Sequence, residues 1–216
     1  MAYSLEEFWR TRLAAVEIAA ACSRPGWSTL TTRDDSFVEA SLSLRTDFDD
    51  LSCPVWLVAA PGAVGKSMFA RELCAATGAV YVDLAQAEAV GGSYVVGGLV
   101  NNNLLDQWKA GRTTLVIDAL DEARLRVTQA AFEDFLQDVA SVARSGALPL
   151  VLIGRVGIVE ECWAQLNDRA GFNCPIFDIE FFSPDRAVDF VMASLGKLAR
   201  TTHGDVSSAL VTHESE

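Results

Sequence analysis

A glycine-containing segment at residues 60–67 most constrains how this chain can fold. It reads A-P-G-A-V-G-K-S and matches the pattern G-x-x-x-x-G-K-[ST], except that Ala60 replaces the first glycine. The apolar run before it, residues 54–59 (PVWLVA), predicts a buried strand, and the pattern at residues 66–77 predicts a helix that ends at Gly78. A strand, a glycine loop and a helix in this order predict an α/β fold.

The chemistry of this segment suits a polyphosphate. Backbone N–H groups in a tight loop supply hydrogen-bond donors without bulk, and the helix N-terminus adds partial positive charge. We expect Gly62 and Gly65 to let the backbone approach the ligand, Lys66 to reach the β- and γ-phosphates, and the Ser67 hydroxyl to coordinate Mg²⁺. The alternative is a chance match to a short pattern. The predicted nucleotide-binding residues are Ala60, Pro61, Gly62, Ala63, Val64, Gly65, Lys66, Ser67 and Met68.

Apolar runs alternate with helical patterns along the rest of the chain, which predicts a doubly wound parallel five-stranded sheet with helices on both faces. One full strand separates the phosphate-loop strand from the strand that ends at Asp118. That spacing is typical of P-loop NTPases with an inserted strand between the phosphate-loop and Asp118 strands. The other predicted strands are residues 79–84, 113–118, 148–153 and 175–181.

The flanking segments divide the chain into three predicted regions. Residues 1–52 hold an N-terminal helix and a nucleotide-flanking segment, residues 53–200 form the P-loop NTPase core, and residues 201–216 form a polar tail. Ser4 and Glu7 form a capping box that predicts the start of the N-terminal helix. The other local predictions are a short strand near 37–44, a long connection with two Gly-Gly pairs at 85–100, an amphipathic helix at 130–144 and an N-cap at Ser183.

Carboxylates follow the apolar strand that ends at Asp118. Because ligands bind at the carboxyl ends of parallel strands, we expect Asp118 to hold the hydrated Mg²⁺ opposite Ser67. Asp121 and Glu122 lie one turn further, and either could deprotonate the attacking water, with reach favouring Glu122. The alternative is that both acids only begin a solvated turn before Arg124.

The next strand, residues 148–153, leads into Gly154 and Arg155. The planar guanidinium of Arg155 can hold two phosphate oxygens, so we expect it to sense or stabilise the γ-phosphate. The alternative is a surface arginine paired with one of the many acids.

The composition excludes several function classes. The net charge of −12, without a run of Lys or Arg, argues against non-specific nucleic-acid binding. Five widely spaced cysteines without a C-x-x-C pattern argue against a zinc site or a disulfide framework, and predict buried reduced thiols. Without a secretory signal or an apolar membrane span, the expected location is cytoplasmic, with no membrane partner.

Taken together, these motifs resemble the STAND class of signalling NTPases, especially its NACHT-like branch, within the AAA+/ASCE superfamily. The resemblance covers residues 36–195 and is carried by APGAVGKS, by LVIDALDEAR around Asp118, by VLIGR ending at Arg155, and by the segment from Phe182 to Phe190. It implies an ATP-dependent, slowly hydrolysing switch, often in signalling or defence. STAND proteins usually continue into helical lids and a sensor, which a chain of 216 residues does not accommodate. The resemblance therefore leaves open a fragment, the nucleotide core of a larger system, or an ATPase acting with partners.

Two other functions stay open. The first is a nucleotide-sensing regulatory module that does not hydrolyse, because Ala119 rather than an acid follows Asp118. The second is an AAA+-like remodelling ATPase subunit, which would assemble into rings. The expected cofactors are ATP, with GTP as the alternative, and Mg²⁺. The expected partners are the nucleotide and either other proteins or further copies of this chain.

Overall fold

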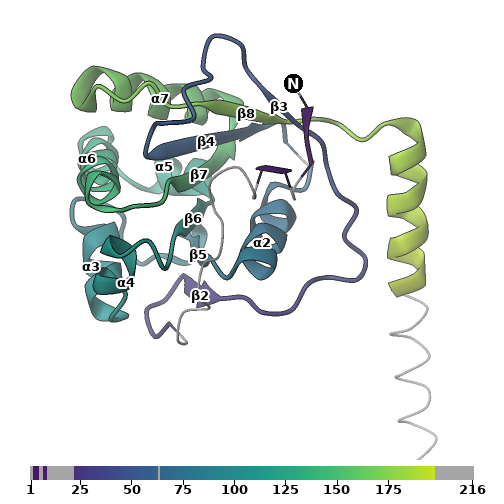
Figure 1. Cartoon of the computed structure of the whole chain (residues 1–216), viewed down its shortest axis with the longest axis horizontal. Helices are drawn as coiled ribbons and strands as arrows, with labels where there is room; N and C mark the ends of the chain where they lie inside the picture. The colour runs from purple at the N-terminus through teal and green to yellow at the C-terminus, as the bar shows by residue number, and fades with distance from the viewer. Residues whose placement is uncertain (1, 5–6, 9–21, 63, 198–216) are drawn as a thin grey trace, which may run out of the picture. The chain divides into compact units, whose positions relative to one another are not determined.

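The computed structural model describes residues 2–4, 7–8, 22–62 and 64–197 (Figure 1). The chain forms two compact units, one comprising residues 1–33 and 40–181, the other residues 34–39 and 182–216. The predicted helix beyond Phe8, Ala63 of the glycine loop and the predicted polar tail at 201–216 lie outside the described residues. The boundaries predicted at residues 52 and 200 remain predictions.

The first unit contains a sheet whose central part is parallel, as the alternating pattern predicts. Its five strands lie in the order β8-β4-β7-β6-β5. The strand that lies between β4 and β6 in the sequence, predicted at residues 79–84, is β5, and it lies beyond β6 in the sheet. Strand β7 instead separates the phosphate-loop strand β4 from the Asp118 strand β6 in space, so β7 is the inserted strand. The bounds are β4 Val55–Ala60, β5 Val80–Asp83, β6 Leu115–Asp118, β7 Leu150–Arg155 and β8 Ile176–Ile179.

Three short antiparallel strands extend this sheet at its edges, so the described sheet has eight strands rather than the predicted five. Strand β3 (Leu42–Leu44) pairs with β8, and β1 (Ala2–Tyr3) pairs with β3. At the opposite edge, β2 (Trp27–Thr29) pairs with β5. Strands of two or three residues are too short to give a periodic hydrophobic signal, which explains why the pattern predicts only the one near residues 37–44.

Helices cover both faces of the sheet, as Figure 1 shows. Helix α2 (Lys66–Thr77) lies on one face, where Phe69, Leu73 and Cys74 are buried. Phe8 is buried too, with its ring 5.3 Å from Trp56 and 4.7 Å from Phe177. The capping box before it is confirmed: the Glu7 N–H donates to Ser4 Oγ at 3.1 Å, and the Ser4 N–H donates to Glu7 Oε2 at 3.2 Å.

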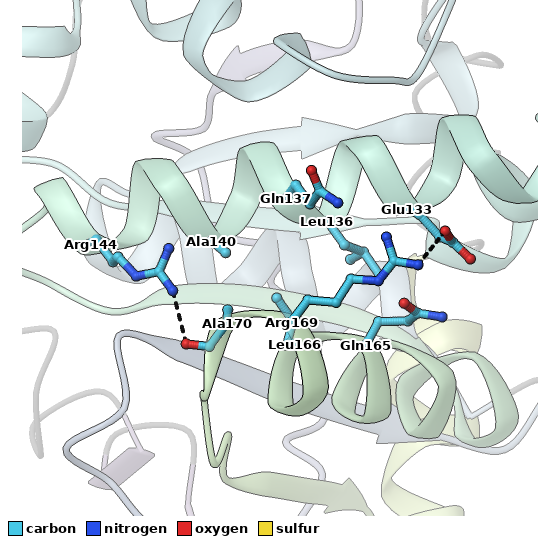
Figure 2. A pocket seen from close by; sticks show the side chains of 9 residues that line it. All are labelled: Glu133, Leu136, Gln137, Ala140, Arg144, Gln165, Leu166, Arg169 and Ala170. Carbon is cyan, nitrogen blue, oxygen red and sulfur yellow. Dashed lines mark hydrogen bonds and ion pairs between the residues drawn. The ribbon is translucent and has the colours of Figure 1, made fainter.

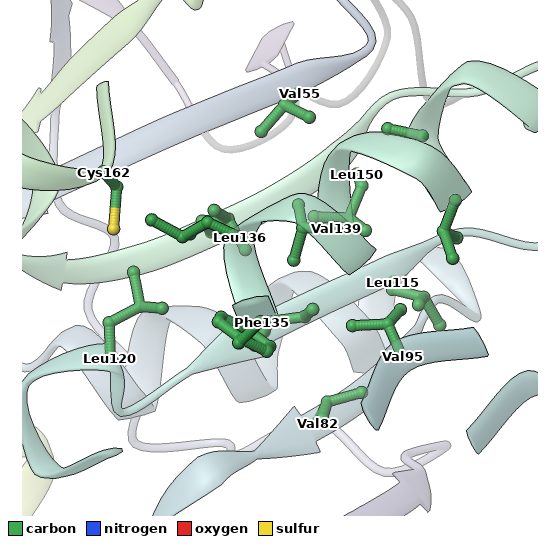
Figure 3. Packing of buried hydrophobic residues seen from close by; sticks show 14 of the residues in the cluster. Val55, Val82, Val95, Leu115, Leu120, Phe135, Leu136, Val139, Leu150 and Cys162 are labelled. Carbon is green, nitrogen blue, oxygen red and sulfur yellow. The ribbon is translucent and has the colours of Figure 1, made fainter. Parts of the chain in front are cut away.

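The opposite face carries the larger apolar cluster (Figure 3). The amphipathic pattern at residues 130–144 forms the longest described helix of this layer, and its Phe135, Leu136 and Val139 pack against Leu115 and Leu150 of the sheet. The helices that contribute to this cluster are α3 Tyr94–Asn101, α4 Leu105–Lys109, α5 Leu120–Arg126, α6 Gln129–Ser145 and α7 Val156–Ala170.

The prediction of a long connection at residues 85–100 is wrong. The short 3₁₀ helix η1 (Leu84–Gln86) and α3 occupy most of it. Gly98 of α3 is buried against the Trp27 ring. A Cβ at this position would lie 2.0 Å from the ring, so the close packing requires glycine. Asp138 of α6 accepts hydrogen bonds from the first turn of α3, at 2.5 Å from Val95 N and 3.3 Å from Val96 N. Burial nonetheless raises the pKa of the Asp138 carboxyl above its usual value.

The second unit contains a helix at residues 184–197. Its predicted N-cap is confirmed, since the Arg186 N–H donates to Ser183 Oγ at 3.4 Å. The Lys197 ammonium lies 2.7 Å from the Asp34 carboxylate.

Two predictions from composition have structural outcomes. The five cysteines are thiols, with four of them buried and Cys22 half-buried, as predicted. Within the ranges that the structure describes, no helix combines the length and apolar character that crossing a membrane requires.

Candidate functional site

The glycine loop lies between the carboxyl end of β4 and the N-terminus of α2, as predicted. Gly65 is the N-cap of α2 with φ +83°, a left-handed conformation that explains why glycine stands there. Its carbonyl accepts the first helical hydrogen bond from the Phe69 N–H at 2.9 Å. Ala60 is instead the buried last residue of an extended strand, so its position does not require glycine.

The surroundings of the loop leave room for an anion. A Cβ added to Gly62 would meet nothing within 4 Å, and one added to Gly65 would meet only Met68 Cβ at 4.0 Å. The first turn of α2 contains no acidic side chain. Lys66 is half-buried, and Ser67 and Met68 are exposed at this turn. The N–H groups of a helix's first turn have no partner within the helix, so this turn offers donors and positive potential to a ligand.

Asp118, the last residue of β6, is 1% exposed. Its Oδ2 atom accepts a hydrogen bond from the Tyr81 hydroxyl at 3.0 Å. Burial, and then the negative charge of Asp118, raise the pKa of Tyr81 well above its usual value, so this phenol stays protonated and donates. The other oxygen, Oδ1, is buried and has no hydrogen-bond partner among the described residues.

An unpartnered, buried carboxylate oxygen is costly unless a cation or a donor reaches it. Carboxylate and hydroxyl oxygens are ligands that suit Mg²⁺, which usually keeps several waters and takes few protein ligands. Asp118 and Ser67 therefore fit a hydrated magnesium ion beside a nucleotide.

The strand order brings the glycine loop, Asp118 and Arg155 to the same end of the sheet, where the parallel strands have their carboxyl ends. The register pairs Ala60 of β4 with Arg155 of β7, and Asp83 of β5 with Asp118 of β6. Helix α2 packs against β6, the strand that ends at Asp118. With strands about 4.8 Å apart and Asp118 level with Val58 in the register, two residues before Ala60, the ends of β4 and β6 lie about 12 Å apart, a gap that a metal–phosphate group can span.

Asp121 and Arg155, two of the predicted catalytic residues, bind each other. Arg155 Nε lies 2.9 Å from Asp121 Oδ2, and the Arg155 N–H donates to Asp121 Oδ1 at 3.1 Å. The Asp121 side chain is 9% exposed, whereas that of Arg155 is 62% exposed. Arg155 is also the N-cap residue of α7. Asp121 thus ties α5 to the start of α7: one of its oxygens accepts a hydrogen bond from the Arg155 backbone, and the other forms an ion pair with the Arg155 side chain.

Glu122 has different surroundings. It lies in the first turn of α5, and its side chain is exposed. Its backbone carbonyl accepts a hydrogen bond from Arg126 Nε at 3.2 Å. Across the described ranges, no hydrogen bond or ion pair engages the Glu122 carboxylate, so this carboxylate is accessible to a water molecule.

Ala119 joins β6 to α5 in a left-handed conformation, with φ 65° and ψ 37°. This conformation costs a residue with a Cβ about 1–2 kcal/mol, and such strain concentrates at functional sites. Nothing in the local sequence predicts it, because the D-A-L-D-E segment reads equally well as a simple helix start.

A groove of about 520 Å³ lies between α6 and α7 (Figure 2). Leu136 and Leu166 line it, and Arg169 crosses it to reach Glu133 at 2.5 Å. Arg144 donates to the Ala170 carbonyl at 2.8 Å. The arginines of this groove therefore bind neighbouring groups of the protein, and none of the predicted site residues lines it.

Comparisons with known proteins add little. The chain matches no protein-family model, and no curated protein matches it. The structure of C. elegans PCH-2 is similar with a TM-score of 0.44 and 14% sequence identity, over 73% of this chain and 43% of that one. This chain thus spans less than half of that chain's length. This similarity is too low to assign a family or a function to the chain.

Proposed function

We propose that this chain binds a nucleoside triphosphate together with Mg²⁺ and hydrolyses it slowly, so that it works as a switch. The nucleotide is ATP, and GTP is the alternative. One observation carries the proposal: Oδ1 of Asp118, buried and without a hydrogen-bond partner among the described residues, lies at the same end of the sheet as the glycine loop. A carboxylate in this state fits a cation, and the loop fits the anion that the cation accompanies.

The residues of the glycine loop and the residues at the end of β6 then have separate roles in binding. The N–H groups of the loop and of the first turn of α2 donate to phosphate oxygens, and Lys66 adds a positive charge. Ser67 and Asp118 would hold the ion, Ser67 through its hydroxyl and Asp118 by accepting hydrogen bonds from the waters bound to Mg²⁺. When bound, Mg²⁺ neutralises charge on the phosphate oxygens. GTP and ATP share these triphosphate contacts.

Hydrolysis needs a base and a group that stabilises negative charge. Glu122 is the better candidate base, because its carboxylate is exposed whereas both Asp121 oxygens are engaged by Arg155, one by a backbone hydrogen bond and one by an ion pair. Arg155 reaches a γ-phosphate only if its side chain leaves Asp121. We infer that Asp121 is a positioning residue that holds Arg155 in one of two places, which gives the switch two states.

The resemblance to NACHT-like STAND proteins supports the finer form of this proposal. In that form the chain works in signalling or defence in the cytoplasm, and its two states are read by protein partners or by other copies of the chain. An AAA+-like remodelling subunit is the alternative within the same superfamily, and light scattering with ATP would detect its ring assembly.

A regulatory module that binds nucleotide without hydrolysing it is the second candidate. The ion pair between Asp121 and Arg155 favours it, since two predicted catalytic groups bind each other. Phosphate release by the pure protein separates the two functions: steady release supports the ATPase, and its absence despite tight ATP binding supports the module.

Calorimetric titration of ATP with Mg²⁺ tests the proposal. Lys66→Ala is expected to abolish detectable binding, because it removes the cation from the loop. Lys109→Ala is the matched control, since Lys109 is an exposed lysine at the end of α4, and it should bind like the wild type. Equal affinity in Lys66→Ala and the wild type, or no binding by the wild type, would contradict the proposal.

A further inference from the structure

We propose that Tyr81 is a positioning residue for the metal-facing carboxylate: by binding Oδ2 of Asp118, it leaves Oδ1 as the oxygen that faces Mg²⁺. This inference rests on the function proposed above and names a residue outside the phosphate loop and the acidic strand end. The two oxygens of Asp118 are in unlike states, one bonded to Tyr81 at 3.0 Å and one buried without a partner among the described residues.

The sheet register explains how Tyr81 reaches Asp118. Tyr81 pairs with Val116 on the neighbouring strand, and Asp118 lies two residues beyond Val116 on the same face. Diagonal neighbours of this kind have their Cα atoms about 7–8 Å apart, a distance that an aromatic side chain spans. A shorter side chain at position 81 would leave this carboxylate without its donor.

Packing holds the Tyr81 ring in place. The residue is 5% exposed, and helix α2 packs against β5, the strand that carries it. The Arg71 guanidinium of α2 lies 5.9 Å from the centre of the ring. The same helix carries Lys66 and Ser67 in its first turn. Helix α2 therefore packs over β5, the strand that carries Tyr81, and its first turn presents Lys66 and Ser67 to the nucleotide.

A fixed carboxylate matters for this metal. Mg²⁺ arranges its bound waters in a near-octahedral shell, so a carboxylate that rotates freely spends less time in the orientation in which it accepts hydrogen bonds from those waters. Groups that orient a metal-binding side chain typically contribute about 10–100-fold in metal affinity or activity. The loss of the Tyr81 hydroxyl should therefore weaken the effect of Mg²⁺ and leave the metal-independent contacts of the phosphate loop intact.

The test compares ATP affinity in Mg²⁺ with ATP affinity in EDTA, by calorimetry, for the wild type, Tyr81→Phe and Tyr94→Phe. Tyr94 is the matched control because it is also a buried tyrosine, on α3. We expect Tyr81→Phe to reduce the Mg²⁺-dependent gain in affinity about tenfold and to leave the affinity in EDTA unchanged. Tyr94→Phe should leave both affinities unchanged. Thermal unfolding without ligand checks that both variants are folded.

A second measurement does not depend on how Tyr81→Phe folds. With 3-fluorotyrosine incorporated at position 81, the ¹⁹F resonance should shift when Mg²⁺ is added to the protein with ATP, and should stay unchanged when ATP is added in EDTA. An unchanged resonance on adding Mg²⁺ would overturn the inference.

The outcomes separate the inference from the function on which it rests. If the wild type gains affinity with Mg²⁺ and Tyr81→Phe gains equally, the inference fails and nucleotide binding stands. A larger gain in Tyr81→Phe also overturns it, because the hydrogen bond would then compete with the metal. If the wild type does not bind ATP in either condition, the proposed function itself fails.

Discussion

Asp121 and Glu122 are neighbours in the sequence, yet their side chains have opposite surroundings. Asp121 is buried, accepts a hydrogen bond from the Arg155 backbone N–H and forms an ion pair with the Arg155 guanidinium, whereas Glu122 is exposed on the first turn of α5. A helix turns about 100° per residue, so adjacent side chains cannot share a face. This difference in burial separates a positioning acid from a candidate base.

Replacing Glu122 by glutamine tests that distinction. Glu122→Gln keeps the size of the side chain but removes its basicity, so we expect phosphate release to slow about 10²–10⁴-fold while ATP affinity stays unchanged. Single-turnover phosphate release and calorimetry measure the two quantities. Glu88→Gln, at another exposed glutamate, should leave both unchanged. Full turnover by Glu122→Gln would move the base to Asp121 or to another protein.

At this scale the sequence predicts which residues gather at the site but not how they bond. The motif spacing is enough to predict Lys66 and Ser67 at the start of a helix, and Asp118 and Arg155 at strand ends. The spacing predicts neither the bond between Tyr81 and Asp118 nor the bond between Asp121 and Arg155. The two residues of the first pair are 37 positions apart in the sequence, and those of the second pair are 34 positions apart. Such pairs depend on strand register and on helix placement.

At the scale of elements, long periodic segments are predictable and short ones are not. The five parallel strands and helices α2 and α6 appear as predicted, because each buries a continuous or periodic apolar surface. Helix α3 escapes prediction because its Gly-Gly pair reads as a turn signal. It forms because Gly98 lets the Trp27 ring approach and because Asp138 accepts hydrogen bonds from its first turn.

The two glycines of α3 should respond oppositely to alanine. Gly98→Ala would place a Cβ 2.0 Å from the Trp27 ring, so we expect a loss of about 1–3 kcal/mol in the free energy of unfolding. Gly97→Ala would place its Cβ 3.5 Å from Arg24 Nη1, an ordinary contact, and should gain about 0.5–1 kcal/mol from helix propensity. Urea unfolding measures both. Equal effects of the two substitutions would refute the packing of Trp27 against α3.

At the scale of the first unit, the strand order determines whether a binding site exists. Lys66, which begins the helix after β4, and Asp118, which ends β6, are far apart in the sequence, and the described sheet brings the carboxyl ends of β4 and β6 to one end with β7 between them. Helix α2 then packs against β6 and covers the face on which Asp118 lies. The hydrophobic pattern predicts the strands, and the assembled sheet brings the glycine loop and Asp118 to the same end of the sheet.

The most direct test of the proposed magnesium site is ATP affinity with Mg²⁺ and in EDTA for the wild type and Asp118→Asn. We expect the wild type to bind ATP more tightly with Mg²⁺, because Asp118 and Ser67 would then hold the ion that accompanies the phosphates. Asp118→Asn should keep the wild-type affinity in EDTA and lose most of the gain from Mg²⁺. A full Mg²⁺-dependent gain in Asp118→Asn, or no ATP binding by the wild type, would contradict the account.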